Sequence, residues 1–206
     1  MRQNTQVKNV FVLCTGRCGS TTFTRAFEHA SNWTSGHETR SHLLGPDRLN
    51  YPCWHIEADN RLSWILGRLD RAFGKRALYI HLTRDPEAVA RSYEQRINKG
   101  IMRAYARGIL LNTSKLPKDI SPYEFARDYV DTVTENIRLF LQDKPNKMEF
   151  RLESACDDTE KLWAHLELSG NLEAALAEWD IKHNAALNKA DSYQRRSILG
   201  RLRHFK

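Results

Sequence analysis

The chain has 206 residues, and its 32 lysines and arginines outnumber its 25 aspartates and glutamates, which gives a formal net charge of +7. Hydrophobic residues make up 41% of the chain and charged residues 28%, which excludes a disordered acidic tail, a collagen-like repeat and a membrane bundle. This length suffices for one domain over residues 1–206. No apolar run approaches the roughly 20 residues of a transmembrane helix, and no signal-peptide core precedes Val10, so we expect a cytoplasmic protein without membrane contact.

Short apolar strands alternate with amphipathic helices along the chain. The first strand is expected over 9–15, and apolar residues recur at helical spacing from Phe23 to Ala30. The other expected elements are, in chain order, a strand at 53–57, a helix at 62–73, a strand at 77–83, a helix from Glu87 onward with Pro86 suited to its first turn, a helix opening at Ser121, a strand at 148–152 and a helix at 159–168. This alternation predicts an α/β fold, with a mostly parallel sheet covered by helices on both faces. The basic, weakly periodic segment 98–120 is predicted to be a lid.

The turn after the first expected strand has the composition of an anion site. It reads Gly16-Arg17-Cys18-Gly19-Ser20-Thr21-Thr22. A glycine turn between a strand and a helix directs free backbone N–H groups to a point above the helix amino end, where the helix dipole favours negative charge. Arg17 adds a positive charge, and the three hydroxyl side chains after Gly19 add donors. The turn therefore predicts a phosphate or sulfate site; the alternative is a tight turn with a Ser or Thr N-cap and an exposed arginine.

A second anion site is predicted where the strand at 77–83 ends. Arg84-Asp85-Pro86 follows this strand, and Ser92 lies eight positions after Arg84 on the next expected helix. Ligands bind at the carboxyl ends of the strands in open α/β sheets, so Arg84 and Ser92 are placed to hold a second phosphate. Taken alone, the same run also fits a strand-to-helix corner capped by Asp85, but the two features together favour a ligand.

The sequence comes close to three familiar motifs but matches none of them. A Walker A loop needs a lysine directly after its second glycine, and none follows Gly19. One residue too many separates Cys18 from Arg25 for a cysteine phosphatase loop. His37 and His42 are five positions apart and do not share one helical face as zinc-protease ligands do, so no metal site is expected.

With both anion motifs in this order, the sequence resembles the sulfotransferases that use 3′-phosphoadenosine 5′-phosphosulfate (PAPS). The segment 17–21 matches the family's loop for the 5′-phosphosulfate, with cysteine in place of the usual serine, and Arg84-Asp85-Pro86 with Ser92 matches its 3′-phosphate motif. The resemblance implies a P-loop NTPase-like fold, a three-layer sandwich, and metal-free in-line transfer of a sulfuryl group to a hydroxyl or amine of a small-molecule or carbohydrate acceptor. The residues that it assigns to PAPS are Arg17, which would also stabilise charge during transfer, Cys18, Gly19, Ser20, Thr21, Thr22, Arg84 and Ser92.

The same resemblance implies a glutamate or histidine that takes the acceptor's proton. One branch of the family places a glutamate shortly after the first helix, where Glu38 is the first choice and His37 stands beside it. Another branch points to the strand at 53–57, which offers His55 and then Glu57. A solvated loop position for His37 and a satisfied core position for His55 are the structural alternatives.

The rest of the nucleotide site is less defined. Adenine recognition needs an aromatic face, for which Trp33, Trp54 and Trp64 are candidates. The basic tail at 194–206 either covers the nucleotide or is solvated. Two other functions remain open: a P-loop-type nucleotide kinase or NTPase, which the missing Walker lysine opposes, and a basic nucleic-acid-binding domain, for which no recognisable motif is present.

Overall fold

Five short parallel strands form the centre of the computed structural model, which describes residues 7–181. The strands lie in the order β2-β3-β1-β4-β5, and every neighbouring pair is parallel. The α/β fold with a mostly parallel sheet is therefore confirmed. The strands are β1 Asn9–Leu13, β2 Thr34–His37, β3 His55–Ala58, β4 Leu78–Thr83 and β5 Lys147–Arg151.

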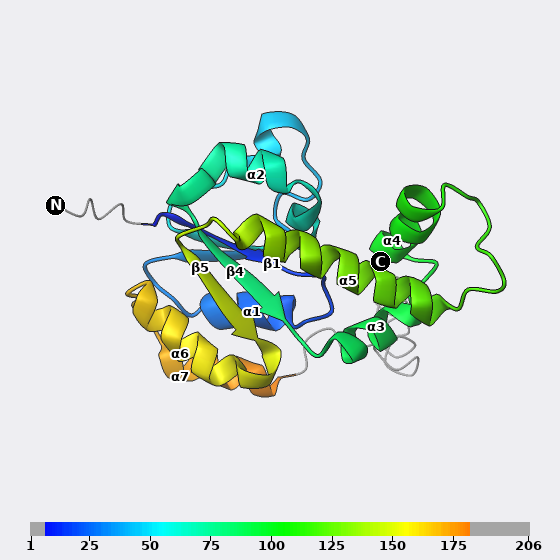
Figure 1. Cartoon of the computed structure of the whole chain (residues 1–206). Helices are drawn as coiled ribbons and strands as arrows, with labels where there is room; N and C mark the ends of the chain where they lie inside the picture. The colour runs from blue at the N-terminus through cyan, green and yellow to red at the C-terminus, as the bar shows by residue number, and fades with distance from the viewer. Residues whose placement is uncertain (1–6, 182–206) are drawn as a thin grey trace, which may run out of the picture.

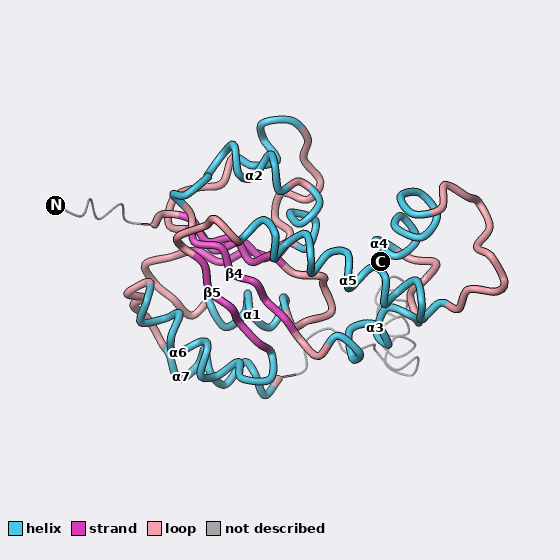
Figure 2. Tube along the Cα trace, viewed as in Figure 1, coloured by secondary structure: helices cyan, strands magenta, loops and turns pink. Residues whose placement is uncertain are grey.

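Helices cover both faces of this sheet (Figure 1). Figure 2 shows the strands as one layer between the helices. One face packs against α1, α6 and α7, and the other against α2, α3 and α5. The α-helices are α1 Ser20–Phe27, α2 Leu66–Phe73, α3 Pro86–Glu94, α4 Gly100–Arg103, α5 Pro122–Leu141, α6 Ala155–His165 and α7 Leu172–Ala177. None of the helices within residues 7–181 has the length and apolar character needed to cross a bilayer.

Strand β1 explains why the centre of the sheet reads as a continuous apolar run. Val10 and Val12 face the α1 side of the sheet, while Phe11 and Leu13 face the α2 and α5 side, and all four are fully buried. Both faces of a central parallel strand need apolar side chains, because each face packs against a helical layer. Each such side chain contributes about 1.5–3 kcal/mol to folding through burial.

The chain connectivity defines where a ligand binds in such a sheet. After β1 the chain crosses to β2 at one edge through α1, and after β4 it continues through α3 and α5 to β5 at the other edge. The strand order therefore reverses between β1 and β4, which are neighbours. In open α/β sheets the crevice at the carboxyl ends of the strands beside this reversal receives the ligand. Both predicted anion motifs follow strands that border the crevice.

The structure departs from the sequence expectation most clearly at β2, at the helix expected over 62–73 and at the start of α6. Strand β2 was not expected, because its sequence Thr-Ser-Gly-His is polar and only Gly36 of the four is buried. The helix expected at 62–73 is two elements, a 3₁₀ turn over Asn60–Trp64 and then α2, because the backbone of Ile65 leaves the helical conformation between them. Helix α6 begins at Ala155, before the expected residue 159. The sequence pattern missed this first turn because the turn is acidic and carries no apolar stripe.

The segment 98–120 lies at the same end of the molecule as α3 and the amino end of α5 (Figure 1). It contains α4 and a π-helical stretch over Ala104–Leu110, whose Tyr105 packs into the core below α5. The side chains of Ile109 and Leu110 are exposed. A lid function for this segment stays a prediction, and the basic tail at 194–206 lies outside the described residues.

Candidate active site

The loop between β1 and α1 has the backbone of an anion-binding nest. Gly16, Arg17 and Gly19 all have positive φ angles, of 82°, 61° and 91°. The φ of Gly19 strains any residue that carries a Cβ, and that Cβ would also lie 2.7 Å from Cδ1 of Leu152, so glycine is favoured at this position. Gly19 is also the N-cap of α1, and no side chain caps this helix. Its first backbone N–H groups are therefore directed at the crevice, where they favour an anion.

Some side chains of the loop are hydrogen-bond donors at the surface of the site, and others are buried in the core. Ser20 and Thr21 are half-buried at the start of α1, whereas Thr22 is buried on the inner face of the helix. The thiol of Cys18 is fully buried beside Cys14 in the core below α1. Hydrogen bonding with Cys14 and with backbone N–H groups of the loop lowers the pKa of Cys18, although burial opposes this. Cys18 therefore has only its backbone N–H to offer a ligand.

Three side chains join the two predicted motifs into one site. Nε of Arg17 donates a hydrogen bond of 3.0 Å to Oγ of Ser92 on α3. Nη1 of Arg84 donates to the carbonyl oxygen of Arg17 at 3.2 Å. A hollow of about 460 Å³ opens beside Arg84, between the carboxyl ends of β4 and β5 and helices α3 and α5. The structure thus brings Arg17, Arg84 and Ser92 together at the crevice.

The positive charges at this point repel one another. Burial lowers the pKa of Arg17, and the charges of Arg96 and, more weakly, Arg84 lower it further. Neither Arg84 nor Arg96 forms an ion pair with a carboxylate among residues 7–181. Arg96 lies four residues after Ser92, and its backbone N–H donates to the carbonyl of Tyr93, so it continues the turn that carries Ser92. Such a cluster is stabilised by a multiply charged anion.

Two tyrosines fix the corner from which the loop starts. The hydroxyls of Tyr93 on α3 and Tyr129 on α5 both donate to the carbonyl oxygen of Thr15, at 2.7 and 2.8 Å. Burial raises the pKa of both tyrosines, so both remain protonated donors. A Cβ on Gly16 would collide with the hydroxyl of Tyr93. These contacts therefore fix the position of the helix that carries Ser92 relative to the loop that carries Arg17.

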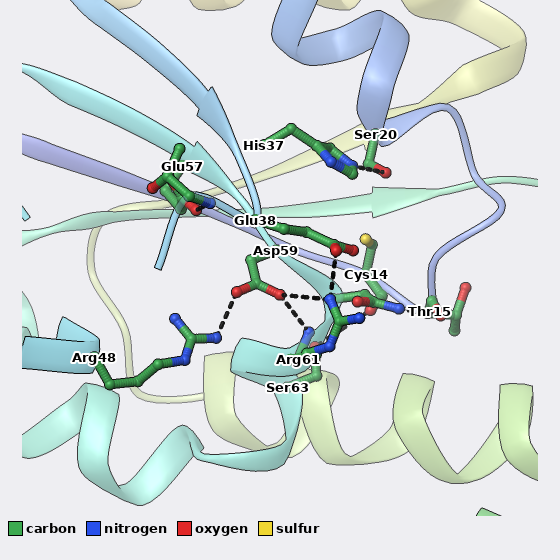
Figure 3. A network of polar contacts seen from close by, with 12 residues as sticks. Cys14, Thr15, Ser20, His37, Glu38, Arg48, Glu57, Asp59, Arg61 and Ser63 are labelled. Atoms are coloured by element: carbon green, nitrogen blue, oxygen red, sulfur yellow. Dashed lines mark hydrogen bonds and ion pairs between the residues drawn. The ribbon is translucent and has the colours of Figure 1, made fainter. Parts of the chain in front are cut away.

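The carboxyl end of β2 approaches the loop from the other side (Figure 3). Nε2 of His37, the last residue of β2, is hydrogen-bonded to Oγ of Ser20 at 3.0 Å. Glu38 follows in a left-handed backbone conformation, with φ of 53°, and its carboxylate forms an ion pair with Arg61. Both predicted residues of this region therefore lie beside the anion loop, although the sequence did not predict the strand that carries them.

The second pair of base candidates lies elsewhere and is already bonded. His55 is the first residue of β3, at the opposite end of the strand from the crevice, and its Nε2 is 2.9 Å from Oε2 of Glu57. Glu57 is fully buried and accepts further hydrogen bonds from the backbone N–H and the hydroxyl of Thr39, both at 2.7 Å. The structure does not bring His55 to the loop; instead, the pair fixes the turn that presents Glu38.

The tryptophans differ in their relation to the crevice. Trp33 and Trp54 directly precede β2 and β3, so they lie at the amino end of the sheet, where their rings pack edge to face. Trp64 packs against Tyr105 and Tyr129 on the crevice side of the fold. Of the three adenine-stacking candidates, only Trp64 is near the loop. Among residues 7–181, no group of three or more His, Cys, Asp or Glu side chains is placed to hold a metal ion.

Two arginines of the site were not among the predicted residues. Arg61 pairs with Glu38, and Arg96 stands beside Arg17 and Ser92. Two positions in the sequence mark these residues. Arg61 lies three residues after the carboxyl end of β3, and Arg96 lies one helical turn after Ser92.

Comparison with known proteins identifies a shared fold. No protein-family model matches the chain, and no curated protein matches it. Among solved structures, it is similar to a sulfotransferase domain from the curacin biosynthetic pathway, with a TM-score of 0.60 and 18% sequence identity over 82% of this chain and 76% of that chain. The five-stranded parallel sheet with its flanking helices is therefore a fold that this chain shares with a sulfotransferase domain.

Proposed function

We propose that this protein is a PAPS-dependent sulfotransferase that moves a sulfuryl group to a hydroxyl or amine of a small-molecule or carbohydrate acceptor. The observation that carries the proposal is the bonded unit of Arg17, Arg84 and Ser92, which joins two anion-binding motifs at the reversal point of the sheet. A nucleotide with phosphate groups at both its 5′ and 3′ positions matches two anion sites that share one crevice. The fold shared with a sulfotransferase domain supports the same proposal.

The residues present fit such a nucleotide. The positive φ angles of Gly16 and Gly19 and the uncapped start of α1 suit a 5′-phosphosulfate, as does the half-buried hydroxyl of Ser20. Arg84 and Ser92 would hold the 3′-phosphate. Arg96 adds a third positive charge to those of Arg17 and Arg84. Of the three tryptophan candidates for adenine, Trp64 is favoured, because it packs against Tyr129, whose hydroxyl bonds to Thr15 at the start of the loop.

When bound, the nucleotide supplies a sulfuryl group on a phosphate leaving group. Arg17 and the backbone N–H groups of Gly19 and Ser20 would offset the negative charge that develops on that leaving group, because they are fixed in place before the reaction. Glu38 is the first choice for taking the acceptor's proton, and His37, which is bonded to Ser20 of the loop, is the second. Both approach the loop from the end of β2 (Figure 3). In the sheet, β2 and β4, the strand before Arg84, lie on opposite sides of β1.

The cysteines support a reducing compartment. All four are free thiols, and Cys53 and Cys156 are exposed. Disulfides are rare where glutathione and thioredoxin keep thiols reduced, so we propose that the protein acts in the cytoplasm.

Titration calorimetry tests the nucleotide assignment. The protein is expected to bind adenosine 3′,5′-bisphosphate at least about tenfold more tightly than AMP, because hydrogen bonds to a charged group contribute about 1.5–3 kcal/mol. Arg84→Ala should remove this preference, whereas Arg91→Ala should keep it, because Arg91 lies next to Ser92 on α3 but pairs with Glu87 and Glu94. Equal affinity of the parent protein for the two nucleotides contradicts the proposal. Transfer of radiolabelled sulfate from PAPS to a panel of hydroxyl and amine acceptors then tests the reaction.

A further inference from the structure

Glu38 is held by an arginine that belongs to neither anion motif. The backbone N–H of Glu38 donates to the carbonyl of Ala58 at 3.0 Å, which extends the pairing of β2 with β3 by one residue. The next structural element, the 3₁₀ turn after β3, carries Arg61, whose Nη1 pairs with the Glu38 carboxylate. The carboxylate is thus fixed from two directions, by its own backbone and by Arg61.

Arg61 is itself anchored to a buried charge (Figure 3). Asp59 is fully buried at the end of β3, and its Oδ1 accepts the backbone N–H of Arg61 at 2.8 Å and lies 4.0 Å from Nη1 of the same residue. Its Oδ2 pairs with Arg48, which also donates to the hydroxyl of Tyr51 at 2.9 Å. The charges therefore alternate from Arg48 through Asp59 and Arg61 to Glu38, and run from the core to the crevice.

The two ends of this chain of charges serve different purposes. The Arg48–Asp59 pair is almost fully buried, so breaking it leaves an uncompensated charge in the core and weakens the fold. The side chains of Arg61 and Glu38 are 47% and 29% exposed, and ion pairs at such positions contribute little to stability. Folding thus gives little reason for the Arg61–Glu38 pair, while the position of Glu38 beside His37 and Ser20 gives a functional one.

We propose that Arg61 is a positioning residue of the transfer reaction, which holds the Glu38 carboxylate at the anion loop. This inference rests on the proposed function and adds a residue to it. Arg61 acts through Glu38, because its guanidinium pairs with one oxygen of the carboxylate, Oε2. Small displacements of a reacting group have large kinetic effects, so orientation by a neighbouring charge is sufficient to control the rate.

Steady-state kinetics of Arg61→Gln, Arg61→Lys and Arg127→Gln test the proposal. Arg61→Gln is expected to lower kcat by about tenfold to hundredfold, with the KM for PAPS unchanged, because the nucleotide residues are untouched. Arg61→Lys should recover most of the loss, since lysine restores the charge within reach of Glu38. Arg127→Gln is the matched control, because Arg127 is 40% exposed and forms a comparable ion pair with Asp131 on α5. It should leave kcat unchanged.

A double variant separates positioning from a general structural effect. In a Glu38→Gln background, Arg61→Gln should cause no further fall in kcat, because its effect passes through the missing carboxylate. The thermal unfolding midpoint of Arg61→Gln should match that of Arg127→Gln.

Three results would overturn the inference while leaving the sulfotransferase proposal in place: a kcat for Arg61→Gln within twofold of the parent, equal losses for the Gln and Lys variants, or additive losses in the double variant. Loss of sulfuryl transfer in the parent protein, together with equal affinity for adenosine 3′,5′-bisphosphate and AMP, would remove the proposed function and the inference with it.

Discussion

Arg17 and Ser92 are 75 residues apart in the sequence and are joined by a hydrogen bond of 3.0 Å from Nε to Oγ. Arg84 closes the unit by donating to the carbonyl oxygen of Arg17. The residue that serves the 5′ end of the proposed nucleotide is thereby bonded to a residue that serves the 3′ end. A change at one motif is therefore expected to be felt at the other.

Ser92→Ala tests this coupling. The variant is expected to weaken binding of adenosine 3′,5′-bisphosphate by about tenfold, because a hydrogen bond to a charged phosphate is lost. It should also alter the affinity for adenosine 5′-phosphosulfate, which lacks the 3′-phosphate, because Arg17 loses its hydrogen bond to Ser92. Calorimetric titration of both nucleotides is the measurement. Ser31→Ala, at an exposed serine after α1, is the control. An unchanged affinity for adenosine 5′-phosphosulfate would show that the two ends act independently.

Gly19→Ala should disrupt the loop. The φ of 91° at Gly19 is strained for any residue with a Cβ, and that Cβ would lie 2.7 Å from Leu152. We expect a loss of about 1–3 kcal/mol in the free energy of unfolding, measured by urea denaturation, together with loss of nucleotide binding. Gly67→Ala is the matched control, because Gly67 lies in α2 with open space around it. That change should be neutral or should stabilise by about 0.5–1 kcal/mol. Similar losses for both variants would contradict the assignment of special geometry to Gly19.

Glu38→Gln and His37→Gln distinguish the two base candidates. Loss of a general base lowers the rate of the chemical step by about 10²–10⁴-fold and leaves nucleotide binding intact. We expect this outcome for Glu38→Gln, with a smaller effect for His37→Gln through its bond to Ser20. Single-turnover rates and calorimetry on the same samples provide the two readouts. Glu28→Gln, in an exposed pair with Arg25 on α1, controls for loss of a carboxylate. The opposite ranking would transfer the role to His37.

Asp158 makes stability depend on pH. Burial alone would raise the pKa of Asp158, but hydrogen bonds from the backbone N–H of Arg151 and from Lys161 and Ser154 lower it below the usual 3.8. A carboxyl whose pKa is lower in the folded state stabilises the protein above its unfolded pKa, and this contribution is lost as the pH falls through the folded value.

Asp158→Asn should therefore destabilise the protein by about 1–3 kcal/mol at pH 7, because the donors of the β5–α6 connection lose a charged acceptor. The difference from the parent should shrink as the pH falls below 3.8, the ordinary aspartate value. Urea denaturation from pH 7 to pH 3 measures it, with Asp131→Asn, whose carboxylate is exposed, as the control. A difference that stays constant with pH would exclude ionisation of Asp158 as the cause.

The sequence by itself determined the α/β class and the two anion motifs. Val10 to Leu13 are apolar because a central strand is buried on both faces, and the local order of strand, glycine turn and helix makes the loop at 16–22 recognisable without tertiary information. Likewise, Arg84 and Ser92 are eight positions apart within one strand-to-helix connection, so a local pattern is enough to find them.

The tertiary structure decided which residues meet. An edge strand such as β2 is exposed and polar, so no periodicity marks it, and its approach to Ser20 depends on the packing of α1 against β2 and β3. Only the structure shows that His37 and Glu38 lie where β2 ends, at the crevice, whereas His55 begins β3 at the opposite end of the sheet. Arg61 belongs to the site only because it pairs with Glu38, which is distant in the sequence. Arg96 belongs to it because its charge acts on Arg17, which is also distant in the sequence, and because it lies one helical turn after Ser92. Contacts of this kind are fixed by the sheet order and helix packing, because neither sequence spacing nor composition specifies which strand ends become neighbours.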